Sequence, residues 1–138
     1  MAFDPTSDYP LGQKRPELVA TPGGLALDDV TLAQARSGAL SAGEMRATPA
    51  TLRLQADVAR AAGREQLARN LERASELASV PDELLLEVYT ALRPRRATAR
   101  ELEAWAERLE QHDATATAAF VREAAAAYSE RGLLTDGG

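Results

Sequence analysis

Apolar residues recur at helical spacing through most of this chain, and polar or charged residues fill the positions between them. Residues three and four apart lie on one face of a helix, so each such series predicts an amphipathic helix. No stretch shows the strict alternation of a half-buried strand, and we therefore predict an all-α protein. The predicted apolar faces are Leu52, Ala56, Ala59 and Ala62; Leu67, Leu71, Ala74 and Ala78; Leu102, Trp105, Leu109 and His112; and Phe120, Ala124, Ala127 and Tyr128.

Residues that start and stop helices mark the limits of these series. Thr48 followed by Pro49 predicts a start, because threonine caps free main-chain N–H groups and proline suits the first helical position. Gly63 either kinks one long helix or separates two, and the sequence leaves this open. The other boundaries are a first short helix capped by Asp28 or Asp29 and ending near Gly38, capping boxes at Ser41–Glu44 and Thr98–Glu101, a restart at Pro81-Asp82, and stops at Pro94 and Gly132. The six-residue tail Leu133–Gly138 is expected to be frayed.

Residues 82–93 differ from the other segments because apolar residues occupy most of the helix circumference. A helix that is apolar all round is normally buried all round. In so small a chain it is either a central helix or one that a partner half covers. Its apolar residues are Leu84, Leu85, Leu86, Val88, Tyr89 and Leu92.

Residues 1–27 lack this periodicity and hold four of the seven prolines. They also carry large apolar residues, including Tyr9 and Leu11, in which a disordered tail would be poor. We therefore expect an extended, proline-rich arm at 1–27 that lies on another surface. That surface is its own helical body or, as we favour, a partner subunit. Residues 28–138 are expected to form the helical domain, a small open helical bundle.

Composition limits the stability of that bundle. The 138 residues include 29 Ala and 19 Leu but no Ile, and aromatic residues make up 4%. An alanine-rich core brings helices close together but buries little apolar area, and burial contributes only roughly 25 cal/mol per Å². The fold is therefore expected to rely on a partner.

Charge and cysteine content exclude several classes of function. The net charge of −5 argues against a nucleic-acid-binding protein, which needs a basic surface. There is no cysteine, no apolar run long enough to cross a membrane, and no secretory signal pattern in the first residues. We expect a cytoplasmic protein with no nucleic-acid or membrane partner.

No group of residues has the spacing of a catalytic, cofactor-binding or metal site. The single histidine, His112, has no companion ligands and is explained by a place near a helix C-terminus, which favours a cation. The glutamates of 103–110 share one face with Arg100 and Arg108 nearby, which is typical of a solvated helix. We therefore expect no catalytic, cofactor-binding or metal-binding residue on this chain.

The remaining features are those of a docking surface. Three arginines cluster around Pro94, and arginine is enriched in protein interfaces. No aromatic residues lie between them, as a single-strand nucleic-acid binder would require. The candidate partner interface is Tyr9, Leu11, Leu85, Tyr89, Arg93, Arg95 and Arg96.

Six short motifs succeed one another along the chain. They are D-Y-P-L at 8–11, M-R-x-T-P-x-T-L-R-L-Q at 45–55, N-L-E-R-A-S-E-L at 70–77, V-P-D-E at 80–83, Y-T-A-L-R-P at 89–94 and A-F-V-R-E-A at 119–124. In this order and spacing they resemble the small (γ) subunit of adenosylcobalamin-dependent diol dehydratases and glycerol dehydratases. The resemblance covers the chain from about Asp8 to Leu134. Any one motif alone would be weak, but the series is highly specific.

The resemblance implies a subunit without chemistry of its own. In this family a large TIM-barrel subunit holds the substrate and a metal ion, and cobalamin lies between the large and medium subunits. The helical small subunit packs on the large one in an (αβγ)2 complex. The enzyme converts 1,2-propanediol, glycerol or 1,2-ethanediol to an aldehyde and water by a radical mechanism. This chain is then expected to brace the barrel subunit, with adenosylcobalamin bound by the other subunits and the choice of diol decided by the large one.

One alternative and one departure from the family accompany this resemblance. The alternative is a free-standing helical adaptor or regulatory protein, which would be a stable monomer or homodimer without a large obligate partner. The departure concerns an N-terminal leader that some members carry and that is associated with packaging into a bacterial microcompartment. Only seven residues precede Asp8, as in the glycerol dehydratase arrangement. Residence in a microcompartment is therefore expected only through partner subunits.

Overall fold

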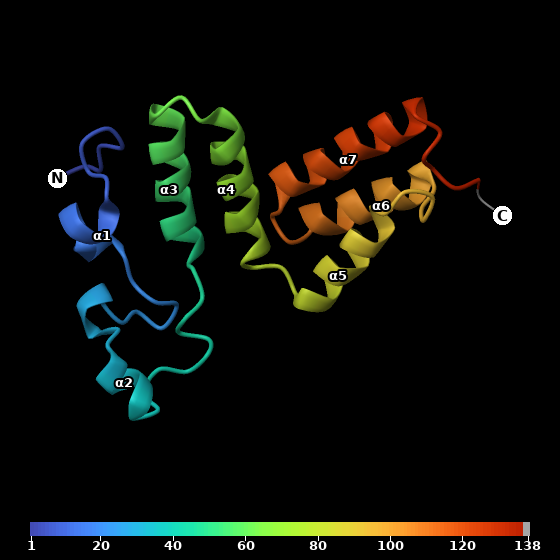
Figure 1. Ribbon diagram of the computed structural model, residues 1–138. Helices are drawn as coiled ribbons and strands as arrows, with labels where there is room; N and C mark the ends of the chain where they lie inside the picture. Colours follow the sequence, from blue (N-terminus) through green and yellow to red (C-terminus); the bar gives the residue numbers. More distant parts are fainter. Residues whose placement is uncertain (137–138) are drawn as a thin grey trace. The chain divides into compact units, whose positions relative to one another are not determined.

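The computed structural model describes residues 1–136, which form helices and turns without a β-strand (Figure 1). The all-α prediction is confirmed. None of the helices within that range is both long and apolar enough to cross a membrane. In chain order the elements are α1 (Leu11–Lys14), the 3-10 turns η1 (Pro16–Leu18) and η2 (Leu27–Asp29), α2 (Leu32–Arg36), α3 (Pro49–Ala61), α4 (Glu65–Leu77), α5 (Asp82–Ala91), α6 (Ala99–Glu110) and α7 (Thr115–Glu130).

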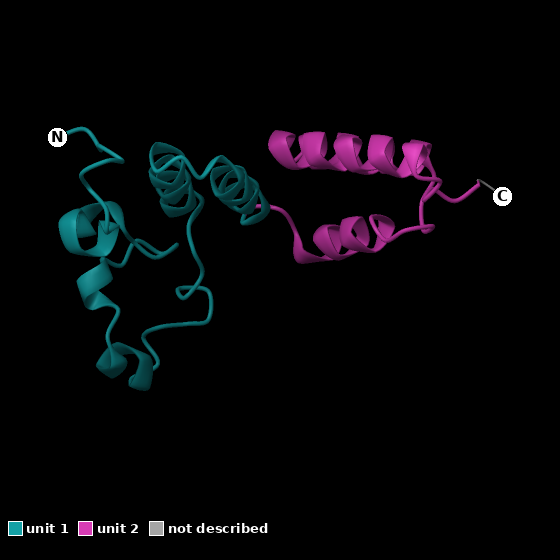
Figure 2. Ribbon diagram, turned by 45° about the horizontal axis from the view of Figure 1, so that its top comes forward, with its two compact units in different colours: residues 1–78 teal, residues 79–138 magenta. Residues whose placement is uncertain are grey.

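The chain divides into two compact units, Met1–Ala78 and Ser79–Gly138 (Figure 2). This differs from the predicted division into an arm at 1–27 and a helical domain at 28–138. The reason lies in hydrogen bonds that join the arm to the residues after it. The Glu44 carboxylate accepts hydrogen bonds from the Thr21 hydroxyl and the Gly23 N–H. The arm also contains α1 and η1, so it is not extended throughout.

The first short helix begins later than predicted. Thr31, not Asp28 or Asp29, caps α2, and its Oγ1 accepts a hydrogen bond from the Gln34 N–H at 3.3 Å. Asp28 and Asp29 lie instead in the preceding 3-10 turn. The cap moves because residues 27–29 already form their own turn, with the Val30 N–H donating to the Leu27 carbonyl.

Helices α3 and α4 form a helical hairpin in the first unit (Figure 1). Gly63 separates them with a φ of 74°, a left-handed conformation that glycine adopts without steric cost, so there are two helices and not one kinked helix. Thr48 caps α3 as predicted and accepts a hydrogen bond from the Thr51 N–H at 3.2 Å. The buried hydrophobic residues between the helices are Ala56, Ala59 and Ala68, with Leu71 packed against them.

In the second unit α6 and α7 pack against each other along their length. Leu102 and Leu109 of α6 and Val121 of α7 are fully buried there. The predicted capping box is present, because Thr98 Oγ1 accepts from the Glu101 N–H while the Glu101 carboxylate accepts from the Thr98 N–H. The predicted inward face of α7 is rotated. The buried residues of α7 are Thr117, Ala118 and Val121, whereas Phe120 is 41% exposed.

The segment after α7 is held in place, although the sequence predicts fraying from 133 onward. The Arg95 N–H donates to the Leu133 carbonyl at 2.7 Å, and the Thr135 N–H donates to the Ala97 carbonyl at 3.0 Å. Leu134 packs against the hydrophobic core of this unit. The last part of the predicted frayed tail, 137–138, lies outside the described residues.

Candidate partner interface

Large apolar side chains lie exposed on both units. Eight of them are exposed in the described part of the chain, whereas only seven buried hydrophobic residues there are larger than alanine. Isolated exposed apolar side chains are normal, whereas several that gather on one face mark a surface that another molecule covers. The exposed residues are Met1, Tyr9, Leu32, Met45, Leu67, Leu86, Tyr89 and Phe120.

Helix α5 buries only one face in its own unit. Leu84 and Val88 are buried, at the spacing of one helical turn. Leu86 is 66% exposed and Tyr89 is 56% exposed, while Leu85 is partly buried against the core. Of the two predictions for this apolar helix, burial all round is wrong. Its outer face is exposed in the described part of the chain, as expected for a helix that a partner half covers.

A groove runs between the outer face of α5 and α6. Leu86 and Ala91 of α5 line it together with Trp105 of α6. The guanidinium of Arg108 lies 4.6 Å from the centre of the Trp105 ring, within range of a cation–π interaction. Arg108 also lies 3.6 Å from the Glu87 carboxylate, with both side chains more than half exposed, so this ion pair contributes little stability.

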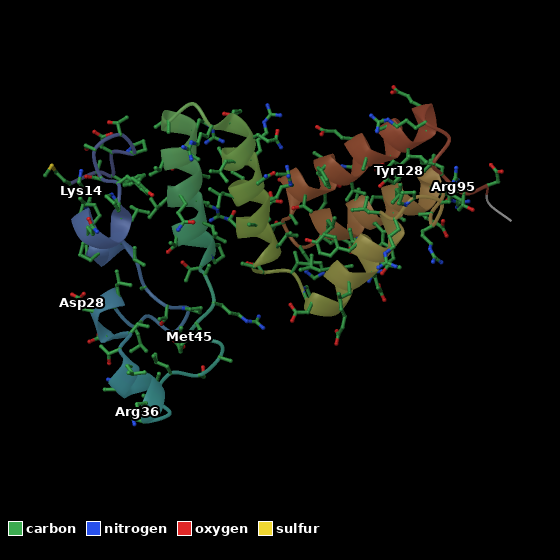
Figure 3. The ribbon with its side chains drawn as sticks, viewed as in Figure 1. Lys14, Asp28, Arg36, Met45, Arg95 and Tyr128 are labelled. Carbon is green, nitrogen blue, oxygen red and sulfur yellow. The ribbon has the colours of Figure 1, made fainter. Side chains whose placement is uncertain are left out.

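The three predicted interface arginines are exposed but do not lie in one place. Arg96 lines the α5–α6 groove. Arg95 lines a separate hollow with Tyr128 and lies close to it (Figure 3). The main chain at Arg95 has a φ of 60°, which is uncommon for a residue other than glycine and carries some strain. Arg93 comes shortly after α5 and is exposed.

The two predicted interface residues of the arm differ in exposure. Tyr9 is 60% exposed and lines an apolar groove on the α3–α4 hairpin, together with Val58, Leu67 and Leu71. Leu11 is only 6% exposed. Its side chain is buried inside its own unit, so a role for Leu11 at a partner surface does not fit the structure. The sequence cannot separate the two because neither lies in a periodic segment.

Arg15 holds the start of the arm together. Its guanidinium donates to the carboxylates of Asp8 at 2.6 Å and Glu17 at 2.5 Å, and to the main-chain carbonyl of Met1 at 3.1 Å. The pKa of Asp8 is lowered, first by the hydrogen bond it accepts from the Asp4 N–H and then by Arg15. The side chains of Arg15 and Asp8 are both mostly shielded from solvent. The arm therefore has local structure of its own.

An ion-pair cluster joins α6 to α7 and was not predicted. Arg122 of α7 donates to the carboxylate of Glu103 at 2.8 Å and to that of Glu110 at 2.5 Å. The hydrogen bond from Arg122 lowers the pKa of Glu110, and the two glutamates raise the pKa of Arg122. The sequence shows the glutamates on one face but gives no sign of a partner twelve to nineteen residues away.

Metal-ligating side chains do not gather in one place within the described residues. No group of three or more His, Asp or Glu side chains in residues 1–136 lies close enough together to hold a metal ion. His112 lies exposed in the turn after α6 and does not line the α5–α6 groove.

Comparison with known proteins gives a family match over nearly the whole chain. The family model described as the dehydratase small subunit matches residues 5–135. The chain belongs to the dehydratase small-subunit family. The resemblance seen in the six motifs is thereby confirmed. Two relatives, both called propanediol dehydratase small subunit, come from Citrobacter freundii and from Salmonella typhimurium strain LT2. Each is 55% identical over 126 residues, which is 91% of this chain and 73% of the relative.

Membership of the dehydratase small-subunit family gives the exposed apolar surfaces a context. A small subunit is one part of an enzyme with several subunits, so it has partner chains. Exposed residues such as Leu86 and Tyr89 are left uncovered by their own unit within the described residues.

Proposed function

We propose that this chain is the small, non-catalytic subunit of an adenosylcobalamin-dependent diol or glycerol dehydratase. In this proposal it braces the large TIM-barrel subunit within an (αβγ)2 complex, and the complex converts a 1,2-diol to an aldehyde and water. The observation that carries the proposal is 55% identity to two propanediol dehydratase small subunits over 91% of the chain.

The small core of the first unit supports a role inside a complex. The α3–α4 hairpin has three alanines as its buried hydrophobic residues. An alanine methyl buries little area, and burial contributes roughly 25 cal/mol per Å², so a partner that covers the exposed side chains would add stability that this hairpin lacks. A free-standing adaptor or regulatory protein would need a larger core of its own. The proposed complex therefore accounts for the core better than the alternative.

The cofactor is proposed to bind to the other subunits. No residue of this chain is proposed to hold the corrinoid. The chain contributes support to the barrel subunit, and no residue of it is proposed to touch the diol. We propose a cytoplasmic enzyme that can enter a microcompartment through its partner subunits.

Co-purification tests the proposal. The chain is expressed with the large and medium dehydratase subunits of the same genome, with an affinity tag on the large subunit alone. We expect all three chains to elute together in size-exclusion chromatography, in equal molar amounts. An adaptor would instead elute alone as a stable monomer or homodimer while the two larger chains co-purify without it, and that result would refute the proposal. A preparation without the tagged subunit controls for retention on the resin.

A further inference from the structure

The α5–α6 groove combines an apolar floor with a basic rim. Leu86 and Trp105 supply apolar surface, and Leu86 is 66% exposed. Arg96 reaches the groove from the segment before α6, and Arg108 reaches it from α6 itself. Glu87 is the acidic residue among those that line it. This composition suits a segment with an apolar side chain for the floor and a carboxylate for the rim.

The charge near this groove runs against that of the whole chain. The chain carries a net charge of −5, yet residues 93–100 contain four arginines and no acidic residue. Within the described residues the side chains of Arg93, Arg95, Arg96 and Arg100 form no ion pair. Arg108 differs, because it lies against Trp105 and near Glu87. Arg96 is thus a basic group on the groove whose charge the described part of this chain leaves unpaired.

The main chain around Arg96 is fixed on both sides. The Arg95 N–H donates to the Leu133 carbonyl, and the Ala97 carbonyl accepts from the Thr135 N–H. Arg95 keeps a left-handed φ of 60°, where glycine would be less strained. Strained non-glycine residues that the surrounding structure holds in place occur preferentially at functional sites. A fixed main chain also reduces the ordering that Arg96 would need on binding.

We propose that the α5–α6 groove binds an acidic segment with an apolar anchor on a partner subunit of the dehydratase complex. Arg96 pairs with a carboxylate of that segment, and the anchor packs on Leu86 and Trp105. This inference rests on the proposed function. A protein segment fits better than a phosphate or a nucleic acid, because the floor of the groove is apolar.

A double variant tests the groove in the assembled enzyme. We compare two double variants. The groove variant carries both Leu86→Ser and Arg96→Glu. The matched control carries both Leu32→Ser and Arg36→Glu, which change an exposed leucine and an arginine on α2. Affinity for the purified assembly of large and medium subunits is measured at low and high salt, and circular dichroism checks helicity. We expect the groove variant to bind at least tenfold more weakly, with a smaller salt dependence, and the control to bind within twofold of wild type.

A second measurement needs no substitution in the groove, so it does not depend on whether a variant folds. Trp105 is the only tryptophan, so 5-hydroxytryptophan incorporated into this chain reports on the groove selectively. Its emission should shift when the partner subunits bind. Equal affinity of groove variant and wild type, equal losses in groove variant and control, or an unchanged emission in a complex that does form would overturn the inference. Self-association of the isolated chain through this groove would also overturn it. If wild type does not bind the two subunits at all, the proposed function itself has failed.

Discussion

Tyr128 donates its hydroxyl hydrogen to the main-chain carbonyl of Leu92 at 2.5 Å, and this hydrogen bond joins α7 to the end of α5. The two residues are thirty-six positions apart and both pack against the core of the second unit. The bond matters for the interface because α5 carries the exposed apolar face. A hydrogen bond that fixes its end also fixes the position of that face.

Replacing Tyr128 with Phe tests this bond. The ring is kept and the donor is lost, so the carbonyl of Leu92 loses its partner from α7. We expect the free energy of unfolding to fall by about 1 kcal/mol. Urea unfolding followed by circular dichroism measures the change. Tyr89→Phe is the control, since Tyr89 is 56% exposed and should show no loss. Equal effects of the two variants would contradict the assigned role.

The Arg122 cluster predicts a loss of stability in acid. Hydrogen bonding to Arg122 holds the pKa of Glu110 below its ordinary value near 4.5. A group with a lowered pKa in the folded state contributes its full stability above the ordinary pKa and loses it as the pH falls through the folded one. The unfolding free energy should therefore be flat above about pH 5 and decline below about pH 4.5. The Glu110→Gln variant should have a lower unfolding free energy than wild type at neutral pH, and its unfolding free energy should fall less in acid.

The control for this pH series is Glu123→Gln on α7. Glu123 is exposed and forms no ion pair with any described residue, so its replacement should leave the acid decline of wild type intact. Thermal melts at half-unit pH intervals give the comparison. If Glu110→Gln loses as much stability in acid as wild type does, the Arg122 cluster does not cause that loss.

The alanine contact between α3 and α4 predicts sensitivity to larger side chains. Ala56 is fully buried between the helices, so Ala56→Leu must push them apart. We expect a loss of about 1–3 kcal/mol in unfolding free energy. Ala61→Leu on the exposed side of α3 is the control and should be nearly neutral. Thermal denaturation compares them, and a neutral Ala56→Leu would mean that the helices are not in close contact.

Tyr9 and Leu11 should respond differently although they are close neighbours in sequence. Leu11 is buried, so Leu11→Ser should destabilise the isolated chain by about 2 kcal/mol. Tyr9 is exposed, so Tyr9→Ser should leave the isolated chain intact and weaken assembly with the larger subunits about tenfold, as loss of an interface aromatic does. Melting curves and binding titrations measure the two effects. An unstable Tyr9→Ser chain would place Tyr9 in the core.

Local signals in the sequence predict the helices well. Thr48, Thr98 with Glu101, and Pro81-Asp82 mark boundaries that the structure reproduces, because caps depend on residues within one turn of each other. At Gly63 the local signal does not decide the structure. Its residue type allows both a kink and a break, and tertiary packing decides between them.

Features that depend on distant contacts are not predictable in this way. The sequence places Tyr89 on an apolar helix but cannot say which face the core covers. The burial of Leu11 and the bond from Arg122 to Glu103 both depend on residues that meet only in the folded chain. The division into two units near residue 78 also depends on distant contacts, since the hydrogen bond between Glu44 and Thr21 joins the arm to the rest of the first unit.

The central claim is that this chain is a required subunit of a diol or glycerol dehydratase. The most direct measurement is the rate of aldehyde formation from 1,2-propanediol and from glycerol by the purified large and medium subunits with adenosylcobalamin, with and without this chain added in equal amount. We predict stable turnover of at least one diol only when the chain is present, and no turnover by the chain alone. Equal and sustained rates with and without the chain would contradict the claim.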